Sequence, residues 1–227
     1  MRIALAGAHG QVARRLGRLL TARGDTVVGV VRNPDHRADL TEDGVTPVVL
    51  DLETASVDDV AAVLEGADAV VFAAGAGPGS GIARKDTVDR AAAVLLADAA
   101  ERAGVRRYLL VSSMGVESVA DGRQPSGMDE VFAAYLGAKL AAEQEVLARR
   151  GLTTTVLRPG GLTDDPGTGS VTLAPHVERG SVPRDDVAAV LVALLDVDGD
   201  GAVLELVGGN TPIGDGVASA VRPGGRG

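Results

Sequence analysis

The chain has 227 residues, 45% of them hydrophobic and only 2% aromatic, which is enough for one domain with a core of alanine, valine and leucine. The absence of cysteine excludes disulfide bonds, thiolate metal sites and a cysteine nucleophile, and the three histidines are too widely spaced to favour a metal site. The net charge of −9 argues against nucleic-acid binding, because proteins that bind nucleic acids usually carry a basic face.

Short apolar segments alternate with helical patterns along the whole chain. The predicted strands cover residues 2–7, 25–32, 45–51, 67–75, 105–113, 153–161 and 202–209. The predicted helices cover residues 10–23, 57–66, 86–104, 129–151 and 184–196. The strands are apolar at consecutive positions, which is typical of strands buried on both faces. The pattern therefore predicts an α/β fold with a doubly wound, mostly parallel sheet and helices on both faces.

The domain organisation follows from the same pattern. We expect residues 1–221 to form one domain, with a small substrate-side portion from about residue 160 to 221. Residues 163–181 are rich in glycine, aspartate and proline, and we interpret them as a loop region with room for a short hairpin. Residues 222–227 are predicted to be a flexible tail.

A glycine turn joins the first predicted strand to the first predicted helix. Its spacing, G-x-x-G-x-x-A, places Gly7 at the sharp turn, Gly10 where the backbone must approach a ligand, and Ala13 where the helix packs on the sheet. The N-terminus of a helix presents unpaired N–H groups and suits a pyrophosphate. The pattern is weak alone, but it lies between a strand and a helix, which is the required context. It predicts a dinucleotide site that includes Gly7, His9, Gly10, Gln11 and Val12; the alternative is a structural turn.

The end of the second predicted strand bears on the choice of nucleotide. Sites that prefer NAD place Asp or Glu there, whereas this chain has Arg32, which can bind a 2′-phosphate and stack on adenine. No carboxylate is expected beside Arg32, and Arg14 and Arg37 are candidates to assist it. We therefore predict NADP(H) in preference to NAD(H); the alternative is a solvated surface arginine.

The next two strand ends complete the predicted nucleotide site. Asp51 and Leu52 follow the third strand and are candidates to flank the adenine, although an ordinary strand end is an equal alternative. Small residues at the end of the fourth strand would let the backbone approach a ribose: Ala73, Ala74 and Gly75.

Candidate catalytic residues follow the fifth strand. Tyr135 and Lys139 are four residues apart on one predicted helix and therefore share a face. A lysine ammonium near a phenol lowers the pKa of that phenol, so Tyr135 could exchange a proton with a carbonyl or an alcohol. Ser113 ends the fifth strand, where its hydroxyl could orient the substrate oxygen. A pair with this spacing is common on helix surfaces, and it gains weight here from its position after Ser113.

Taken together, these motifs resemble the short-chain dehydrogenase/reductase superfamily. GAHGQVA, the strand end Val111-Ser112-Ser113, the Tyr135/Lys139 pair and the segment LRPGGL are most similar to its atypical NAD(P)H-binding branch, which includes epimerases and flavin-reductase-like proteins. The resemblance implies a Rossmann sheet of about seven strands. It implies catalytic roles for Ser113, Tyr135 and Lys139, with Lys139 also binding the ribose. A loop beside the nicotinamide is implied for Pro159, Gly160, Gly161 and Leu162.

One residue departs from the family pattern. Asp89 occupies the position of a catalytic asparagine, and a carboxylate cannot donate a hydrogen bond as an amide does unless it is protonated. This puts the usual proton relay to lysine in doubt, and Asp89 would either pair with Lys139 or face solvent.

Three functions remain open at this stage. The first is an NADP(H)-dependent oxidoreductase that acts on a small carbonyl, quinone or flavin substrate. The second is an NADP(H)-binding redox sensor of NmrA-like type, and the third is an epimerase or dehydratase with a tightly held cofactor. We find no signal peptide and no apolar run near the ~20 residues of a membrane span, so we expect a cytoplasmic protein without a membrane partner. We expect either a monomer or a homodimer that pairs through the helix predicted at 129–151.

Overall fold

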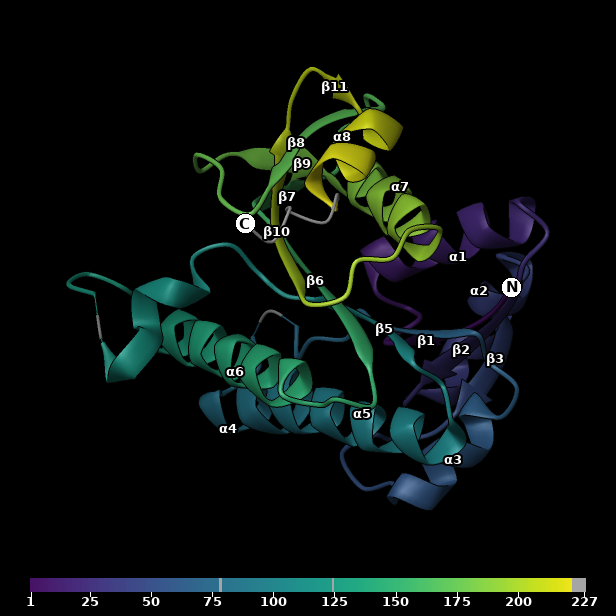
Figure 1. The fold of residues 1–227 in the computed structure, drawn as a ribbon. Coiled ribbons are helices and arrows are strands. Elements are labelled where there is room, and N and C mark those ends of the chain that lie inside the picture. Colours follow the sequence, from purple (N-terminus) through teal and green to yellow (C-terminus); the bar gives the residue numbers. More distant parts are fainter. Residues whose placement is uncertain (78, 124, 222–227) are drawn as a thin grey trace.

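The computed structural model describes residues 1–77, 79–123 and 125–221 (Figure 1). The tail predicted at 222–227 lies outside the described residues. Within the described ranges, no helix combines the length and the apolar composition needed to cross a lipid bilayer.

A nine-stranded sheet forms the centre of the fold, in the order β11-β8-β10-β6-β5-β4-β1-β2-β3. All seven predicted strands are present and pair in parallel: β1 (Arg2–Ala6), β2 (Thr26–Val31), β3 (Thr46–Val49), β4 (Ala69–Phe72), β5 (Arg107–Val111), β6 (Thr153–Pro159) and β10 (Ala202–Gly208). The doubly wound, mostly parallel Rossmann sheet is thus confirmed, although its strand number exceeds seven.

The additional strands come from the C-terminal part of the chain. β8 (Ser170–Ala174) runs antiparallel to β10, and β11 (Thr211–Pro212) runs antiparallel to β8. β7 (Gly161–Thr163) and β9 (Ser181–Pro183) form a separate two-stranded sheet. The prediction of a loop region at 163–181 was therefore wrong for β8, which alternates buried and exposed positions because helix α8 (Ile213–Ala220) packs on it.

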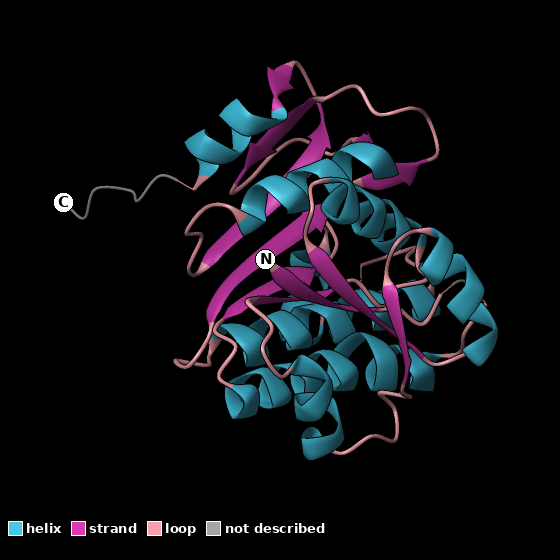
Figure 2. Cartoon of the chain, turned by 90° about the vertical axis from the view of Figure 1, so that its right-hand side faces the viewer, coloured by secondary structure: helices cyan, strands magenta, loops and turns pink. Residues whose placement is uncertain are grey.

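Helices cover both faces of the large sheet. One face carries α1 (Gln11–Ala22) and α7 (Arg184–Leu195), and the other carries α3 (Val57–Leu64), α5 (Ala92–Ala103) and α6 (Glu130–Leu147). Figure 2 shows the strands between these two helical layers. Short helical segments complete the described chain: η1 (Pro34–His36), α2 (Arg37–Glu42), α4 (Ile82–Arg84), η2 (Lys85–Ala91) and η3 (Val116–Gly122).

Strand β1 shows why the sequence is apolar at consecutive positions. Ile3 and Leu5 point into the core beneath α1 and α7, whereas Ala4 and Ala6 belong to the core beneath α3, α5 and α6. Successive side chains of a strand point to opposite faces, so a strand covered on both sides must be apolar throughout.

The helix predicted at 86–104 does not begin as an α-helix. Its first part is a π-helical segment, η2, which continues into α5. The wider π turn places Lys85 and Asp89 on the buried side, with exposures of 8% and 0%. Such turns occur often at functional sites.

Candidate dinucleotide and substrate site

The glycine turn adopts the geometry that its spacing requires. Gly7 has a φ of +75°, and a Cβ there would lie 2.5 Å from the Cα of Ala74 at the end of β4. The Gly10 N–H donates to the Gly7 carbonyl over 2.9 Å, and Gly10 begins α1 without any side-chain cap. The first N–H groups of α1 have no intrahelical partner. The turn therefore leaves the helix N-terminus open toward the carboxyl edge of the sheet.

Replacing Gly7 with alanine is expected to destabilise the fold by about 2–5 kcal/mol, because left-handed strain adds ~1–2 kcal/mol and overpacking against Ala74 adds ~1–3 kcal/mol. Gly66→Ala is the matched control, since Gly66 has a φ of +70° but no atom within 4 Å of an added Cβ. Denaturant unfolding measures both variants. Equal losses would show that the contact with Ala74 is unimportant.

Two cavities meet at this turn and share the wall formed by Gly10 and residues 73–76. The smaller has a volume of about 340 Å³ and is lined by Gly7, His9, Gly10, Arg32, Asp51, Leu52, Ala73, Ala74 and Gly75 among others. The larger has a volume of about 970 Å³ and is lined by Gly10, Gln11, Val12, Ala73, Ala74, Gly75, Ser113, Tyr135, Lys139, Pro159, Gly160, Gly161 and Leu162 among others. The structure thus brings every predicted site residue to one of two adjoining cavities; their individual roles stay predictions.

The shape of this region fits a dinucleotide. The backbone cradle at Gly7 and Gly10 would hold the pyrophosphate against the open N-terminus of α1. The smaller cavity adjoins it at the ends of β2 and β3, and the larger adjoins it at the ends of β4, β5 and β6. Each of the two mononucleotide halves of a dinucleotide would therefore have its own cavity, one on either side of the cradle.

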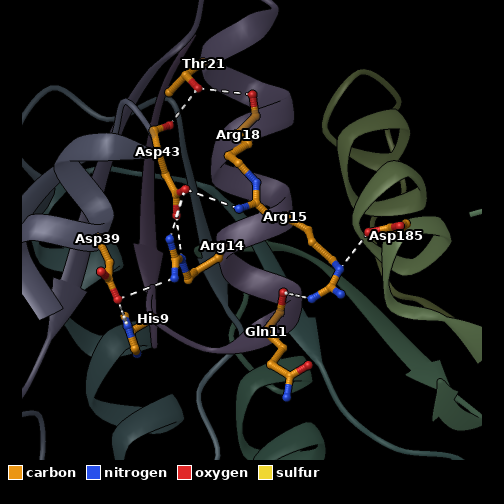
Figure 3. A network of polar contacts seen from close by, with 9 residues as sticks. All are labelled: His9, Gln11, Arg14, Arg15, Arg18, Thr21, Asp39, Asp43 and Asp185. Atoms are coloured by element: carbon orange, nitrogen blue, oxygen red, sulfur yellow. Dashed lines mark hydrogen bonds and ion pairs between the residues drawn. The ribbon is translucent and has the colours of Figure 1, made fainter. Parts of the chain in front are cut away.

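A network of charged side chains fixes the first helix (Figure 3). Arg14 donates to Asp43 over 2.6 Å and to Asp39 over 3.4 Å, while His9 Nε2 lies 2.7 Å from the Asp39 carboxylate. On the other side of α1, Arg15 donates to Asp185 of α7 over 2.6 Å. Arg14 is engaged by these two carboxylates and lines neither cavity, so the structure does not place it beside Arg32 as predicted. Arg37 lines neither cavity.

Arg32 does lie at the rim of the smaller cavity, but a carboxylate accompanies it. Its Nη1 donates to Glu53 Oε2 over 2.9 Å, and Arg84 donates to the same oxygen over 2.7 Å. The hydrogen bond from Arg84 holds the pKa of Glu53 below its ordinary value, with a second hydrogen bond from Thr87 contributing. The expectation that no carboxylate lies beside Arg32 was wrong, because the pairing of β2 with β3 brings Glu53 to it.

Histidine rings form another part of this rim. His9 and His36 stack with ring centroids 3.5 Å apart. Burial lowers the pKa of His36, and the charge of His9 acts in the same direction. His36 was absent from the predicted site because η1, which carries it, gave no periodic signal.

Tyr135 and Ser113 face the larger cavity together. Burial raises the pKa of Tyr135 above its ordinary value; the nearby hydroxyl of Ser113 opposes the rise, and the charge of Asp89 adds to it. The predicted lowering of this pKa by Lys139 does not occur. Tyr135 therefore stays protonated at neutral pH, which suits a proton donor.

Lys139 is buried, four residues after Tyr135 on α6, and its ammonium group has three partners. It is 3% exposed, and its ammonium lies 3.3 Å from Asp89 Oδ1 and donates to the carbonyls of Ala74 and Val111, each over 3.1 Å. Burial lowers the pKa of Lys139, and the carboxylate of Asp89 opposes this. Of the two alternatives for Asp89, the structure shows the pair with Lys139. The pair neutralises Lys139 and explains why this lysine does not acidify the phenol.

A buried arginine fixes the helix that carries Tyr135. Arg158 of β6 donates to Glu143 of α6 over 2.6 Å and to Glu117 of η3 over 2.7 Å. Arg158 and Glu143 are 6% and 2% exposed. This pair ties α6 to the strand that ends at the loop of Pro159, so both walls of the larger cavity have a common support.

Sequence reasoning missed several residues of the larger cavity. Lys85 of η2, Phe132 of α6, and Arg179 and Arg184 of the C-terminal part also line it. Lys85 was hidden by the helical prediction for this segment, which started one residue later. The two arginines lie near β9, a strand that no pattern indicated.

Residues 7–198 match a protein family described as NAD(P)H-binding. The chain belongs to this family. The match extends from the first glycine of the turn to three residues beyond the end of α7, so it includes both cavities. The predicted membership of the atypical short-chain dehydrogenases/reductases is confirmed, and the cofactor of the family is a nicotinamide dinucleotide.

Individual relatives agree with this assignment. The chain is 35% identical to the uncharacterized sugar epimerase YhfK of Bacillus subtilis, over 95% of this chain and 98% of that one. A solved structure from Bacillus halodurans, provisionally named an NAD-dependent epimerase/dehydratase, is similar with a TM-score of 0.86 and 35% identity, over 96% of this chain and 99% of that one. ChuY, an anaerobillin reductase from Escherichia coli O157:H7, is similar with a TM-score of 0.74 and 28% identity, over 92% and 97%.

Proposed function

We propose that the chain is an NADPH-dependent reductase that acts on a small carbonyl, quinone or flavin substrate. One observation carries the proposal: Ser113 and Tyr135 line the same cavity of about 970 Å³, which shares a wall with the dinucleotide cradle. The similarity to ChuY, which is a reductase, supports the same reaction class.

Ser113 and Tyr135 have separate roles in the proposed reaction. A bound reduced nicotinamide would supply a hydride to the substrate. Ser113 holds the substrate oxygen by a hydrogen bond, and the Tyr135 hydroxyl donates the proton that this oxygen takes up. The raised pKa of Tyr135 keeps that proton in place until substrate charge develops. The loop at Pro159 and residues 160–162 forms part of the wall of the larger cavity. After the reaction, Tyr135 takes up a new proton from solvent.

The test is a panel of aldehydes, ketones, quinones and flavins, scored by NADPH oxidation. Oxidation by at least one class, saturable in substrate, is the expected result. Tight NADPH binding without any oxidation would favour the redox sensor instead. Interconversion of sugar epimers without net loss of NADPH would favour the activity for which YhfK is named.

We also propose a preference for NADPH over NADH. Arg32 and Arg84 both line the smaller cavity with the carboxylates of Asp51 and Glu53, and both donate to Glu53, so two guanidinium groups lie where they could bind a 2′-phosphate. Both guanidinium groups can turn from the carboxylate to the phosphate, since 54% and 39% of their side-chain surface is exposed.

Arg32→Ala is expected to weaken NADPH binding about tenfold and NADH binding less than twofold, since a charge-assisted hydrogen bond to the phosphate disappears. Glu53→Gln should act in the opposite sense and strengthen NADPH binding. The matched control is Arg37→Ala, which removes an equal charge outside the cavity. Fluorescence titration of the nicotinamide measures all affinities, and a similar loss for both nucleotides in Arg32→Ala would refute the role of Arg32.

A further inference from the structure

The chain uses lysine in an unusual way. Of its 22 lysine and arginine residues, only Lys85 and Lys139 are lysines. Both are buried, with exposures of 8% and 3%, and both line the larger cavity. Lysine carries a compact charge, whereas arginine carries a broad planar fork, so the two are not interchangeable in a confined site. We infer that both positions require a compact ammonium group in the cavity that Tyr135 also lines.

The two ammonium groups differ in their partners. Lys139 is neutralised by Asp89 at 3.3 Å. Lys85 Nζ donates to the carbonyl of Gly77 over 2.9 Å and lies 5.5 Å from the ring centroid of Tyr135. No carboxylate of the described residues forms an ion pair with it. A buried cation without an opposite charge is unfavourable, and an anionic ligand would relieve this.

The neighbouring carboxylates all have other partners. Asp86, next to Lys85 in the chain, accepts from Arg90 over 2.6 Å. Asp129, which also lines the cavity, accepts from the Phe132 N–H at the start of α6. Lys85 therefore has no ion-pair partner among the described residues, and an anion that enters the cavity could supply one.

The rest of the cavity indicates the kind of molecule that enters. Phe132 and Leu162 line it with exposures of 48% and 41%, which is high for large apolar side chains. The Phe132 ring stacks near that of Tyr135, with centroids 5.9 Å apart. Arg179, for which the described residues supply no ion-pair partner, is the second cation of the lining without an ion pair, besides Lys85. In a chain with a net charge of −9, an anion must be held by such local cations.

We propose that Lys85 binds an anionic group of the substrate beside Tyr135, and that the substrate is an anion with a flat apolar body. The inference rests on the proposed function, since it concerns the same cavity. Negative charge that develops on the substrate during reduction would lie near the same ammonium, so Lys85 would also stabilise the transition state.

A matched pair of fluorescent probes tests the inference without turnover. 1-Anilinonaphthalene-8-sulfonate and N-phenyl-1-naphthylamine share one apolar body, but only the first carries a charge. In the presence of NADP⁺, wild type should bind the sulfonate at least about tenfold more tightly than the neutral probe. Lys85→Met should abolish this difference and leave the neutral probe unaffected, while Lys85→Arg should retain part of it.

Two controls separate the alternatives. Arg102→Met removes an equal charge from an exposed side chain on α5, paired with Asp58 at 3.2 Å, and should change neither affinity. Unchanged thermal unfolding and NADPH affinity in Lys85→Met would show that the fold and the cradle persist. If Lys85 only supported the Tyr135 ring, the ratio of the two probe affinities would not move, and that result, or equal affinities in wild type, would overturn the proposal. The outcome is independent of NADPH oxidation, so either proposal can fail alone.

Discussion

Tyr135→Phe is expected to lower kcat for carbonyl reduction by about 10²- to 10⁴-fold, the usual contribution of a positioned proton donor. The change removes one hydroxyl and keeps the ring, so its packing against Phe132 persists. NADPH affinity should stay within about twofold of wild type, because the phenol does not belong to the cradle. Steady-state kinetics and nicotinamide fluorescence measure the two quantities.

The second tyrosine provides the control. Tyr108 of β5 is 0% exposed, and its hydroxyl donates to the Ala93 carbonyl over 2.8 Å. Tyr108→Phe should therefore reduce stability by about 1 kcal/mol, the net value of one hydrogen bond, and leave kcat unchanged. An unchanged rate in Tyr135→Phe would remove this tyrosine from the mechanism. It would then favour a flavin or quinone as the substrate, since the reduction of these substrates depends less on a proton from the tyrosine.

The pH dependence of the activity is a second test of Tyr135 as the proton donor. Burial raises its pKa, so the proton donor remains protonated through the neutral and mildly alkaline range. Activity that depends on this proton should be lost only as the pH rises through the elevated pKa. A fall near neutral pH would mean that another group supplies the proton.

Local features of the site were predictable because they follow from chain order. Gly7 and Gly10 belong to one strand–turn–helix unit, and Ser113 ends a strand at the edge where ligands gather in such sheets. Tyr135 and Lys139 share a helix face through their spacing alone. These positions needed no knowledge of which strands are neighbours.

Other features depend on tertiary contacts that spacing does not contain. Glu53 reaches Arg32 only because β3 lies beside β2, and the two residues are 21 positions apart. Lys85 turns inward because η2 is a π-helical segment, for which no sequence pattern was available. The pKa of Tyr135 depends on such contacts too. The spacing predicted that Lys139 would lower it, but burial of Tyr135 raises it, and Asp89 neutralises the charge of Lys139.

The Asp89–Lys139 pair gives the largest expected effect on stability. Asp89→Asn keeps the shape of the side chain but leaves the buried ammonium of Lys139 without a counter-charge, and Lys139→Met leaves the carboxylate alone. Each single change is expected to destabilise the fold by about 3–5 kcal/mol, the usual penalty for breaking a buried ion pair. The double variant should lose about 1–3 kcal/mol less than the sum, because neither charge remains. Denaturant unfolding of the four proteins completes the cycle.

The same cycle predicts a dependence on pH. Burial already lowers the pKa of Lys139, and loss of Asp89 removes the charge that opposes this. Between the lowered pKa of the folded state and the ordinary value of about 10.4, the unfolded chain of Asp89→Asn binds more protons than the folded chain, so its stability rises with pH. The deficit relative to wild type should therefore shrink as the pH approaches 10. In the double variant, which has no lysine at this position, that recovery should be absent. A deficit in Asp89→Asn that is constant with pH would mean that Lys139 is not the group left unpaired.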